Sequence, residues 1–183
     1  MTFPATGVNS AEGRAPEELL ARVKEAFGED AMVRINSHTG GLKNEEQYRD
    51  LWLSVERARF LELIDLLGEF DFPMFHVMSG NDDGDHISLY YHFGMFHAAG
   101  RGKRFGVAVG VEVPKEDLVM PSLHSRIPGV EYSEREMREM LGIDFDGLPN
   151  KGLVFLPEDW DESVKPWRRD ETGPKPEDVR ELS

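Results

Sequence analysis

The segment Phe105-Gly-Val-Ala-Val-Gly-Val-Glu-Val113 has valine at every second position from 107 onward and small residues at most positions between. A period of two is typical of a β-strand with one buried face, and Pro114 closes the pattern. Residues 74–78 and 87–93 also alternate, and the polar residues 81–85 between them are typical of a turn. We therefore expect an antiparallel run of three strands.

Two segments N-terminal to these strands have apolar residues at helical spacing. Residues 16–27 are expected to form one helix that stops at Gly28, and residues 56–67 a second that stops at Gly68. Shorter strands are expected at 31–35 and 51–55, with a turn at 38–44. This order predicts a single α+β domain, in which a mostly antiparallel or mixed sheet carries helices on one face.

From residue 121 onward the sequence is rich in proline, and the prolines divide the rest of the chain into short segments. One helix is expected there, at 133–141, with Ser133 as its N-cap and Glu136 three residues later. The remainder is expected to be an extended C-terminal arm that builds no core of its own. We divide the chain into a flexible leader (1–13), an α/β core domain (14–120) and a signature region with a partner-binding arm (121–183). Removing residues 150–183 is then expected to leave the core folded.

Composition limits the possible functions. The chain has 183 residues, and 39% of them are hydrophobic, which is typical of one folded domain. A formal net charge of −14 argues against nucleic-acid binding, which requires a basic surface. The chain has no cysteine, so it cannot hold a usual iron–sulfur cluster. No apolar run is long enough to span a bilayer and the start lacks a signal-peptide pattern, so we expect a cytoplasmic protein that contacts a membrane only through partners.

Several histidines and two loops are candidate binding residues, but each has a simpler interpretation. The four histidines at 76, 86, 92 and 97 are spread along the expected hairpin, whereas a metal needs three or four converging ligands. The turn at 81–85 lacks the alternating ligands of a calcium loop. The basic, glycine-rich segment 100–106 precedes a strand and not the helix that a phosphate loop requires. We expect no catalytic, cofactor-binding or metal-binding residue in this chain.

Charged residues of the expected helix at 133–141 allow two interpretations. Glu134, Glu136 and Glu139 alternate there with Arg135 and Arg138. A small stand-alone hydrolase using these carboxylates would need a cleft and shifted pKa values. No nucleophile or base stands beside them, so a charged helix face or a charge-paired interface is favoured.

The proline-rich segment after residue 149 contains tryptophan and arginine, which often anchor protein interfaces. We predict that Trp160, Trp167, Arg168 and Arg169 contact a partner protein. The alternative is that this segment folds back and its indoles cover the chain's own sheet.

Three ordered blocks of residues 121–170 suggest a family. Pro121-Ser122 with Pro128-Gly129 forms the first block, and Glu134-Arg-Glu136 followed by the Gly142–Pro149 segment forms the second. Leu156-Pro-Glu-Asp-Trp160 and the following Pro166–Asp170 segment form the third. Together these blocks resemble the signature of the thirty-kilodalton, C-type subunit family of complex I, found in NADH-quinone oxidoreductases and in related membrane-bound nickel–iron hydrogenases.

The resemblance implies a scaffold subunit that performs no chemistry of its own. Its arm would clamp the large D-type subunit near the iron–sulfur small subunit, on the cytoplasmic side of the membrane, and support electron transfer coupled to ion translocation. The nickel–iron site or iron–sulfur clusters would lie in those partners. The implied contact residues are Glu134, Arg135, Glu136, Gly142, Phe145, Pro149, Pro157, Trp160, Trp167, Arg168 and Arg169.

Departures from the family pattern indicate which kind of complex within the family this chain belongs to. Glu139, Leu141 and Leu148 stand where the family usually has aspartate, an aromatic residue and histidine, and Lys151-Gly-Leu153 replaces Leu-Arg-Arg. Because those basic residues are typical of NADH- and quinone-linked members, the departures favour a membrane-bound hydrogenase or sulfur-reductase-type complex. A C-type subunit of a NADH-quinone oxidoreductase, or of one with another electron donor, is the alternative. The stand-alone hydrolase, and an adaptor unrelated to redox complexes, are alternatives of other classes.

Overall fold

The computed structural model describes residues 16–43, 46–97 and 104–178. The expected leader at 1–13 and most of the basic loop at 100–106 fall outside these ranges.

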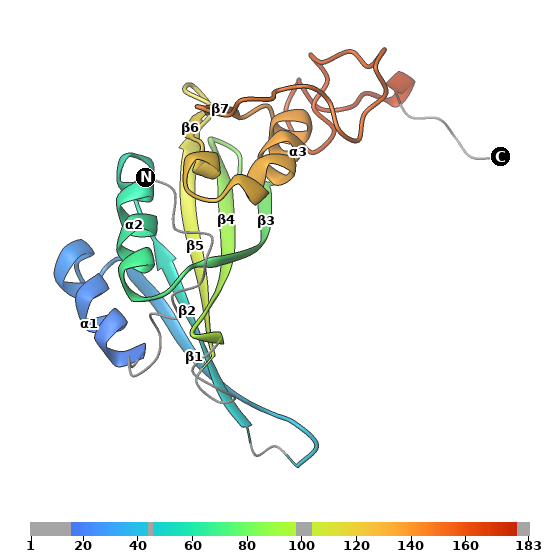
Figure 1. Ribbon diagram of the computed structural model, residues 1–183. Coiled ribbons are helices and arrows are strands. Elements are labelled where there is room, and N and C mark those ends of the chain that lie inside the picture. The colour runs from blue at the N-terminus through green and yellow to red at the C-terminus, as the bar shows by residue number, and fades with distance from the viewer. Residues whose placement is uncertain (1–15, 44–45, 98–103, 179–183) are drawn as a thin grey trace.

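Five strands form one mixed sheet in the order β1-β2-β5-β4-β3 (Figure 1). Neighbouring strands are antiparallel except β2 and β5, which are parallel. A second, two-stranded parallel sheet pairs β6 with β7. The strand bounds are β1 (Met32–Gly40), β2 (Glu46–Ser54), β3 (Met74–Asp82), β4 (His86–Met95), β5 (Phe105–Pro114), β6 (Val119–Pro121) and β7 (Asp144–Asp146).

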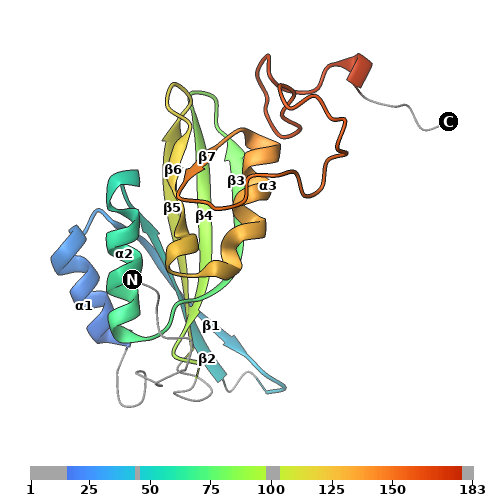
Figure 2. The ribbon, with the colours of Figure 1, turned by 45° about the horizontal axis from the view of Figure 1, so that its top comes forward.

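The helices cover one face of the five-stranded sheet (Figures 1 and 2). The buried valines of β5 and the neighbouring Tyr91 of β4 face them, and the Tyr91 ring lies 4.5 Å from the Phe60 ring of α2. The α-helices are α1 (Pro16–Phe27), α2 (Phe60–Phe70) and α3 (Glu131–Leu141), and the 3-10 turns are η1 (Arg57–Arg59), η3 (Leu123–Ser125), η4 (Pro128–Val130) and η5 (Pro176–Asp178). The predicted single α+β domain is confirmed.

Several predicted element bounds are wrong. The structure extends α2 through Gly68 to Phe70, because burial of Phe70 favours one further turn. Helix α3 begins at Glu131, so Ser133 lies inside it and is not its cap. Strand β1 continues to Gly40, where the sequence predicts a turn from residue 38, because the antiparallel ladder with β2 provides the hydrogen bonds that this polar segment needs. The small β6–β7 pair was not predicted.

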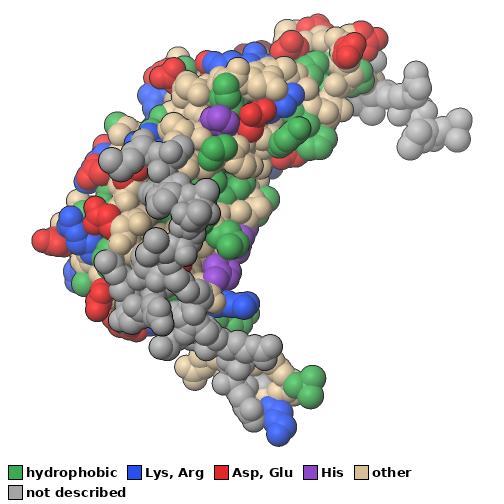
Figure 3. Space-filling model, viewed as in Figure 1, with side chains coloured by type: hydrophobic (Ala, Val, Ile, Leu, Met, Phe, Trp, Pro, Cys, Tyr) green, Lys and Arg blue, Asp and Glu red, His purple; other side chains and the backbone are tan. Residues whose placement is uncertain are grey.

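The molecule is curved around a hollow, and histidine and hydrophobic side chains lie along its margin (Figure 3). Among the described residues, no helix combines the length and the apolar character needed to cross a membrane.

Candidate partner-binding surface

Helix α3 is the element around which the predicted contact residues gather. Its buried face packs on β3, where a Cβ atom at Gly80 would approach the Leu141 Cδ1 atom to 2.5 Å and the Met137 Sδ atom to 2.8 Å. Glycine at position 80 therefore allows the helix to lie close to the strand. The helix ends at Gly142, whose φ of 81° is the left-handed conformation that favours glycine. The packing of α3 on β3 and the left-handed conformation of Gly142 together fix the direction in which the chain leaves α3.

Glu134 lies on the buried face of α3 and its side chain is not exposed. Its carboxylate accepts hydrogen bonds from the Ser122 hydroxyl (2.5 Å) and the Leu123 backbone N–H (2.7 Å). Burial raises the pKa of Glu134 to about 7, although both hydrogen bonds act in the opposite direction. Glu134 was predicted as a contact residue, but here it joins α3 to the preceding η3 turn and does not reach the surface.

We expect Glu134→Gln to stabilise the protein at neutral and higher pH. The unfolded carboxyl loses its proton near 4.5 and the folded one near 7, so the free energy of unfolding falls as the pH rises through this window. Between a pH below 4.5 and a pH above 7, the Glu134 carboxyl lowers the free energy of unfolding by about 3 kcal/mol in total. Urea denaturation from about pH 5 to pH 8 should show this slope in the parent chain and a flatter profile in the variant. Equal slopes would contradict the assignment, and Glu116→Gln, on an exposed loop, is the control.

Glu139, Arg135 and Arg138 bind the backbone of the following segment. The buried Glu139 carboxylate accepts N–H groups of three successive residues, Val154 (2.7 Å), Phe155 (3.2 Å) and Leu156 (3.1 Å). Arg135 donates to the carbonyls of residues 152 and 153, both at 2.9 Å, and Arg138 donates to that of residue 151 at 3.0 Å. The charged face of α3 is therefore used, in large part, to hold the chain's own residues 151–156.

A second attachment holds residues 165–173, which we call the latch. The Trp167 backbone N–H donates to the Met140 carbonyl (3.0 Å), and the Arg168 guanidinium donates to the Leu141 carbonyl (3.1 Å), both at the end of α3. The backbone N–H of Arg169 donates to the Asp82 carboxylate at the tip of the β3–β4 hairpin (2.8 Å). The latch therefore crosses from α3 to the sheet.

Four charged side chains make the latch an ion-pair network. Lys115 lies 2.7 Å from Asp82 and 2.6 Å from Asp170, and Arg168 lies 2.5 Å from Asp170. Burial alone would raise the pKa of Asp170, but the hydrogen bonds from Lys115, Thr172 and Arg168 outweigh it and hold the pKa well below its usual range. The network therefore stabilises the attached arm at neutral pH.

We expect Asp170→Asn to weaken the latch by about 1–3 kcal/mol, because it leaves two partly buried cations with fewer acceptors. The Asp170 pKa is lowered on folding, so this stabilisation is present above the unfolded value of 3.8 and is lost as the pH falls below it. Limited proteolysis of residues 165–173 at about pH 7 should proceed faster in the variant. Asp159→Asn, at an exposed position in the same arm, is the control and should have no effect. Equal cleavage of both variants would contradict the role of Asp170.

Three aromatic side chains around these attachments face outward. The exposed fractions are 65% for Tyr132, 61% for Phe155 and 43% for Trp167. The Arg135 guanidinium lies 5.3 Å from the Tyr132 ring, so these two side chains form a stacked pair on α3. Trp160 is half-buried, and its indole N–H donates to the Val164 carbonyl at 3.0 Å. The sequence predicted the two tryptophans as contact residues but not Tyr132 or Phe155. The one signal for these two in the sequence is that each is an aromatic residue next to one of the three sequence blocks.

The predicted contact residues fall into three groups in the structure. Glu134 and Phe145 are buried, whereas Pro149, Pro157, Trp167 and Arg169 are exposed. The half-buried ones are Arg135, Glu136, Gly142, Trp160 and Arg168. For the set as a whole, contact with a partner stays a prediction.

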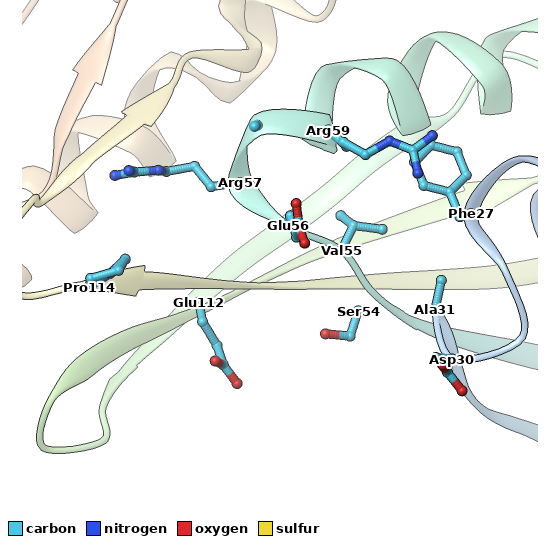
Figure 4. Close-up of a pocket in the computed structure, with 11 residues that line it drawn as sticks. Phe27, Asp30, Ala31, Ser54, Val55, Glu56, Arg57, Arg59, Glu112 and Pro114 are labelled. Carbon is cyan, nitrogen blue, oxygen red and sulfur yellow. The ribbon is translucent and has the colours of Figure 1, made fainter.

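Four cavities formed by the described residues lack the α3 carboxylates that the hydrolase alternative requires. The cavity in Figure 4 has a volume of about 620 Å³ and lies between the end of α1, the start of η1 and β5. Both arginines that line it form ion pairs, Arg57 with Asp117 at 2.6 Å and Arg59 with Glu62 at 2.6 Å. The Arg59 guanidinium also lies 4.1 Å from the centre of the Phe27 ring. Neither Glu134 nor Glu136 lines this cavity or the cavities of 330, 260 and 370 Å³. Within residues 16–43, 46–97 and 104–178, no three His, Asp or Glu side chains could hold a metal ion together.

Residues 53–177 match the family model for the respiratory-chain NADH dehydrogenase, 30 Kd subunit. The chain belongs to this family. The match covers β3, β4 and β5, α3, residues 151–156 and the latch. The resemblance inferred from the three sequence blocks is therefore confirmed.

Relatives from several complexes are similar to this chain. Membrane-bound hydrogenase subunit beta of Pyrococcus furiosus is 31% identical over 90% of both chains. The C subunit of the NADH-quinone oxidoreductase of Mycolicibacterium gilvum is 31% identical over 79% of this chain and 62% of that protein. Formate hydrogenlyase subunit 5 of Escherichia coli is 28% identical over 80% of this chain, which corresponds to 26% of that longer protein. The chain is thus a complex I-related subunit of the kind found in hydrogenase and NADH-quinone oxidoreductase complexes.

Two solved structures share the fold. The trypsin-resistant fragment of Nqo5 has a TM-score of 0.55 and 24% identity, over 72% of this chain and 98% of the fragment. A chain of the membrane-bound sulfane sulfur reductase, an archaeal respiratory membrane complex, has a TM-score of 0.61 and 18% identity over 83% and 82% of the two chains. These similarities confirm the α+β fold of the family.

Proposed function

We propose that this chain is a non-catalytic scaffold subunit of a complex I-related membrane oxidoreductase. In this role it clamps the large, D-type subunit near the iron–sulfur small subunit on the cytoplasmic side of the membrane. The nickel–iron site or iron–sulfur clusters lie in those partners, and this chain keeps them at the fixed spacing that electron transfer, coupled to ion translocation, requires. The chain's own lack of cysteine is consistent with this division of roles.

The attachment of the arm to α3 is the observation that carries the proposal. Backbone groups of residues 151–156 are bound to Glu139, Arg135 and Arg138, and within this segment Leu156 packs against the core while the Phe155 side chain is exposed. The result is an exposed aromatic surface formed by Tyr132, Phe155 and Trp167, which we call the aromatic surface. Aromatic residues with large exposed area are typical anchors of protein interfaces. A large partner subunit would bury them.

A membrane-bound hydrogenase or sulfur-reductase-type complex is the favoured setting. The Pyrococcus furiosus hydrogenase subunit is similar over nine-tenths of both chains, whereas the Mycolicibacterium gilvum oxidoreductase subunit is matched over 62% of its length. The replacement of the family's basic residues by Lys151-Gly-Leu153 also favours the hydrogenase or sulfur-reductase setting. A NADH-quinone oxidoreductase is the second candidate, supported by the family model itself.

Purification of the tagged chain from native membranes tests the proposal. We expect a hydrogenase-large-like subunit and a cysteine-rich small subunit to co-purify, identified by mass spectrometry. The co-purifying subunits also distinguish the two settings, because a hydrogenase and a NADH dehydrogenase module differ in composition. Recovery of the chain only as a free monomer would contradict the proposal.

A further inference from the structure

Strand β3 lies at one edge of the five-stranded sheet and pairs only with β4. In an antiparallel pair, every second residue directs its backbone N–H and C=O groups away from the neighbouring strand. In the part of the chain that the structure describes, no backbone hydrogen bond joins residues 74–80 to any segment other than β4. The outer edge of β3 therefore has backbone groups with which a further strand can pair.

This edge lacks the charged side chains that usually prevent the addition of a strand. Residues 74–80 contain no Asp, Glu, Lys or Arg, although such residues make up 31% of the chain. Natural edge strands commonly carry lysine or another charge that opposes pairing with a second chain. On β3, Met74 and Val77 instead expose 44% and 52% of their surface. The edge is therefore apolar and uncharged on a strongly acidic protein.

A β-bulge determines the side of the sheet to which these two side chains point. Met74 lies opposite Gly94 of β4 and Val77 lies opposite His92, and His76 is the extra residue between them. Because Gly94 and His92 are two residues apart, they face the same side of the sheet, and the bulge places Met74 and Val77 on that side too. Many bulges only twist an edge strand away from a second chain. This one brings two aliphatic side chains together along the free edge.

The free edge is continuous with the parts of the chain that carry the aromatic surface. Gly80 packs against α3, and the Arg169 backbone N–H donates to the Asp82 carboxylate (2.8 Å). The Arg169 guanidinium donates to the side-chain oxygen of Asn81 (3.2 Å), so the latch contacts the last two residues of β3. In the views of Figures 1 and 3, β3 lies on the side of the hollow. A partner that covers Trp167 would therefore meet the end of β3 and could follow its edge along the hollow.

We propose that β3 binds an uncharged, aliphatic β-strand of the large partner subunit, which extends the sheet by one strand. Backbone groups of residues 74–79 form hydrogen bonds with that strand, and its side chains at alternate positions pack on Met74 and Val77. Strand addition of this kind gains affinity from the backbone and specificity from the alternate side chains. The choice of the large subunit rests on the proposed function, because the strand is assigned to the protein that covers the aromatic surface.

Val77→Lys in the full chain tests this proposal. Because a lysine on an edge strand opposes pairing, we expect at least about tenfold less large subunit to co-purify from native membranes than with the parent chain. Val33→Lys is the matched control, since Val33 is an exposed valine (65%) of β1, the strand at the opposite edge of the sheet. It should leave co-purification unchanged. Thermal unfolding of both free variants should match that of the parent, because both valines are largely exposed.

Two further measurements need no change at Val77. Hydrogen–deuterium exchange of the parent chain should show that amides of residues 74–79 that point away from β4 exchange at least about tenfold more slowly in the purified complex than in the free chain. Amides of β1 should exchange equally in both samples. A benzophenone amino acid in place of Met74 should, on irradiation of native membranes, crosslink to a segment of the large subunit with aliphatic side chains at alternate positions.

Several results would overturn the proposal. These are equal exchange of residues 74–79 in the two samples, retention of the large subunit by Val77→Lys, an equal loss with Val33→Lys, or a crosslink to a different protein or to a charged segment. Co-purification with the parent chain decides the scaffold role separately. If the large subunit co-purifies with the parent in those cases, the scaffold role stands without strand addition at β3.

Discussion

Replacing Phe155 and Trp167 together by alanine should abolish assembly with the large subunit and leave the free chain folded. Both side chains expose more than two-fifths of their surface, so their removal should change the free energy of unfolding by less than about 1 kcal/mol. At an interface, buried aromatic anchors contribute about 2 kcal/mol or more each. The double variant should therefore bind its partner about 1,000-fold more weakly. Co-purification and urea denaturation measure the two effects.

Leu42→Ala is the matched control for this experiment. Leu42 is an exposed hydrophobic residue that follows β1, remote in the chain from α3 and the arm. It should leave both stability and assembly unchanged. Normal assembly of the double variant would show that the aromatic surface is not the contact, whereas unfolding of the free double variant would show that these side chains support the fold.

Replacing Glu139 by alanine should release residues 151–156 from α3. The variant loses a buried acceptor that binds three backbone N–H groups, each in a segment with no strand or helix of its own. We expect a cost of about 2–4 kcal/mol in the free energy that holds this segment. Trypsin should then cleave after Lys151 much faster than in the parent chain. Glu139→Gln retains one acceptor oxygen and should show an intermediate rate.

Glu116→Ala is the control, because Glu116 is exposed and lies in the turn after β5. Unchanged cleavage after Lys151 in the Glu139→Ala chain would contradict the role of this carboxylate. Loss of assembly in Glu139→Ala, with Phe155 and Trp167 still present, would indicate that the arm must be held in place before it can bind.

The structure changes one expectation about the arm. The sequence predicts that removal of residues 150–183 leaves the core folded, because few of those residues look apolar enough to belong to a core. Residues 151–156, however, donate backbone hydrogen bonds to Glu139, and the latch donates one to Asp82. Both carboxylates are buried. Their removal would leave two carboxylates without partners, so we now expect the truncated chain to be destabilised.

The sheet and helices were largely predictable from the sequence, because the valines of β5 and the apolar stripe of α2 have clear periods. The polar β1–β2 hairpin has no such alternation over residues 36–50, and its length became clear only from the pairing with β2 and the parallel contact of β2 with β5. Periodicity is a local signal, and pairing between distant strands is not.

The candidate surface was predictable only in part. Tryptophan and arginine indicated a contact region at the arm, but a carboxylate in a charged helix gives no local sign of whether it faces solvent or the backbone of a later segment. Glu134 and Glu139 therefore looked like surface charges, although both are buried and hydrogen-bonded within the chain. Long-range backbone contacts of this kind depend on tertiary structure.

Hydrogen–deuterium exchange of the free chain and of the purified complex tests the central claim most directly. The account predicts that amides of residues 153–169 exchange at least about tenfold more slowly in the complex, while those of α1 exchange equally in both samples. Equal exchange of residues 153–169 in the two samples would contradict the claim that the arm binds a partner.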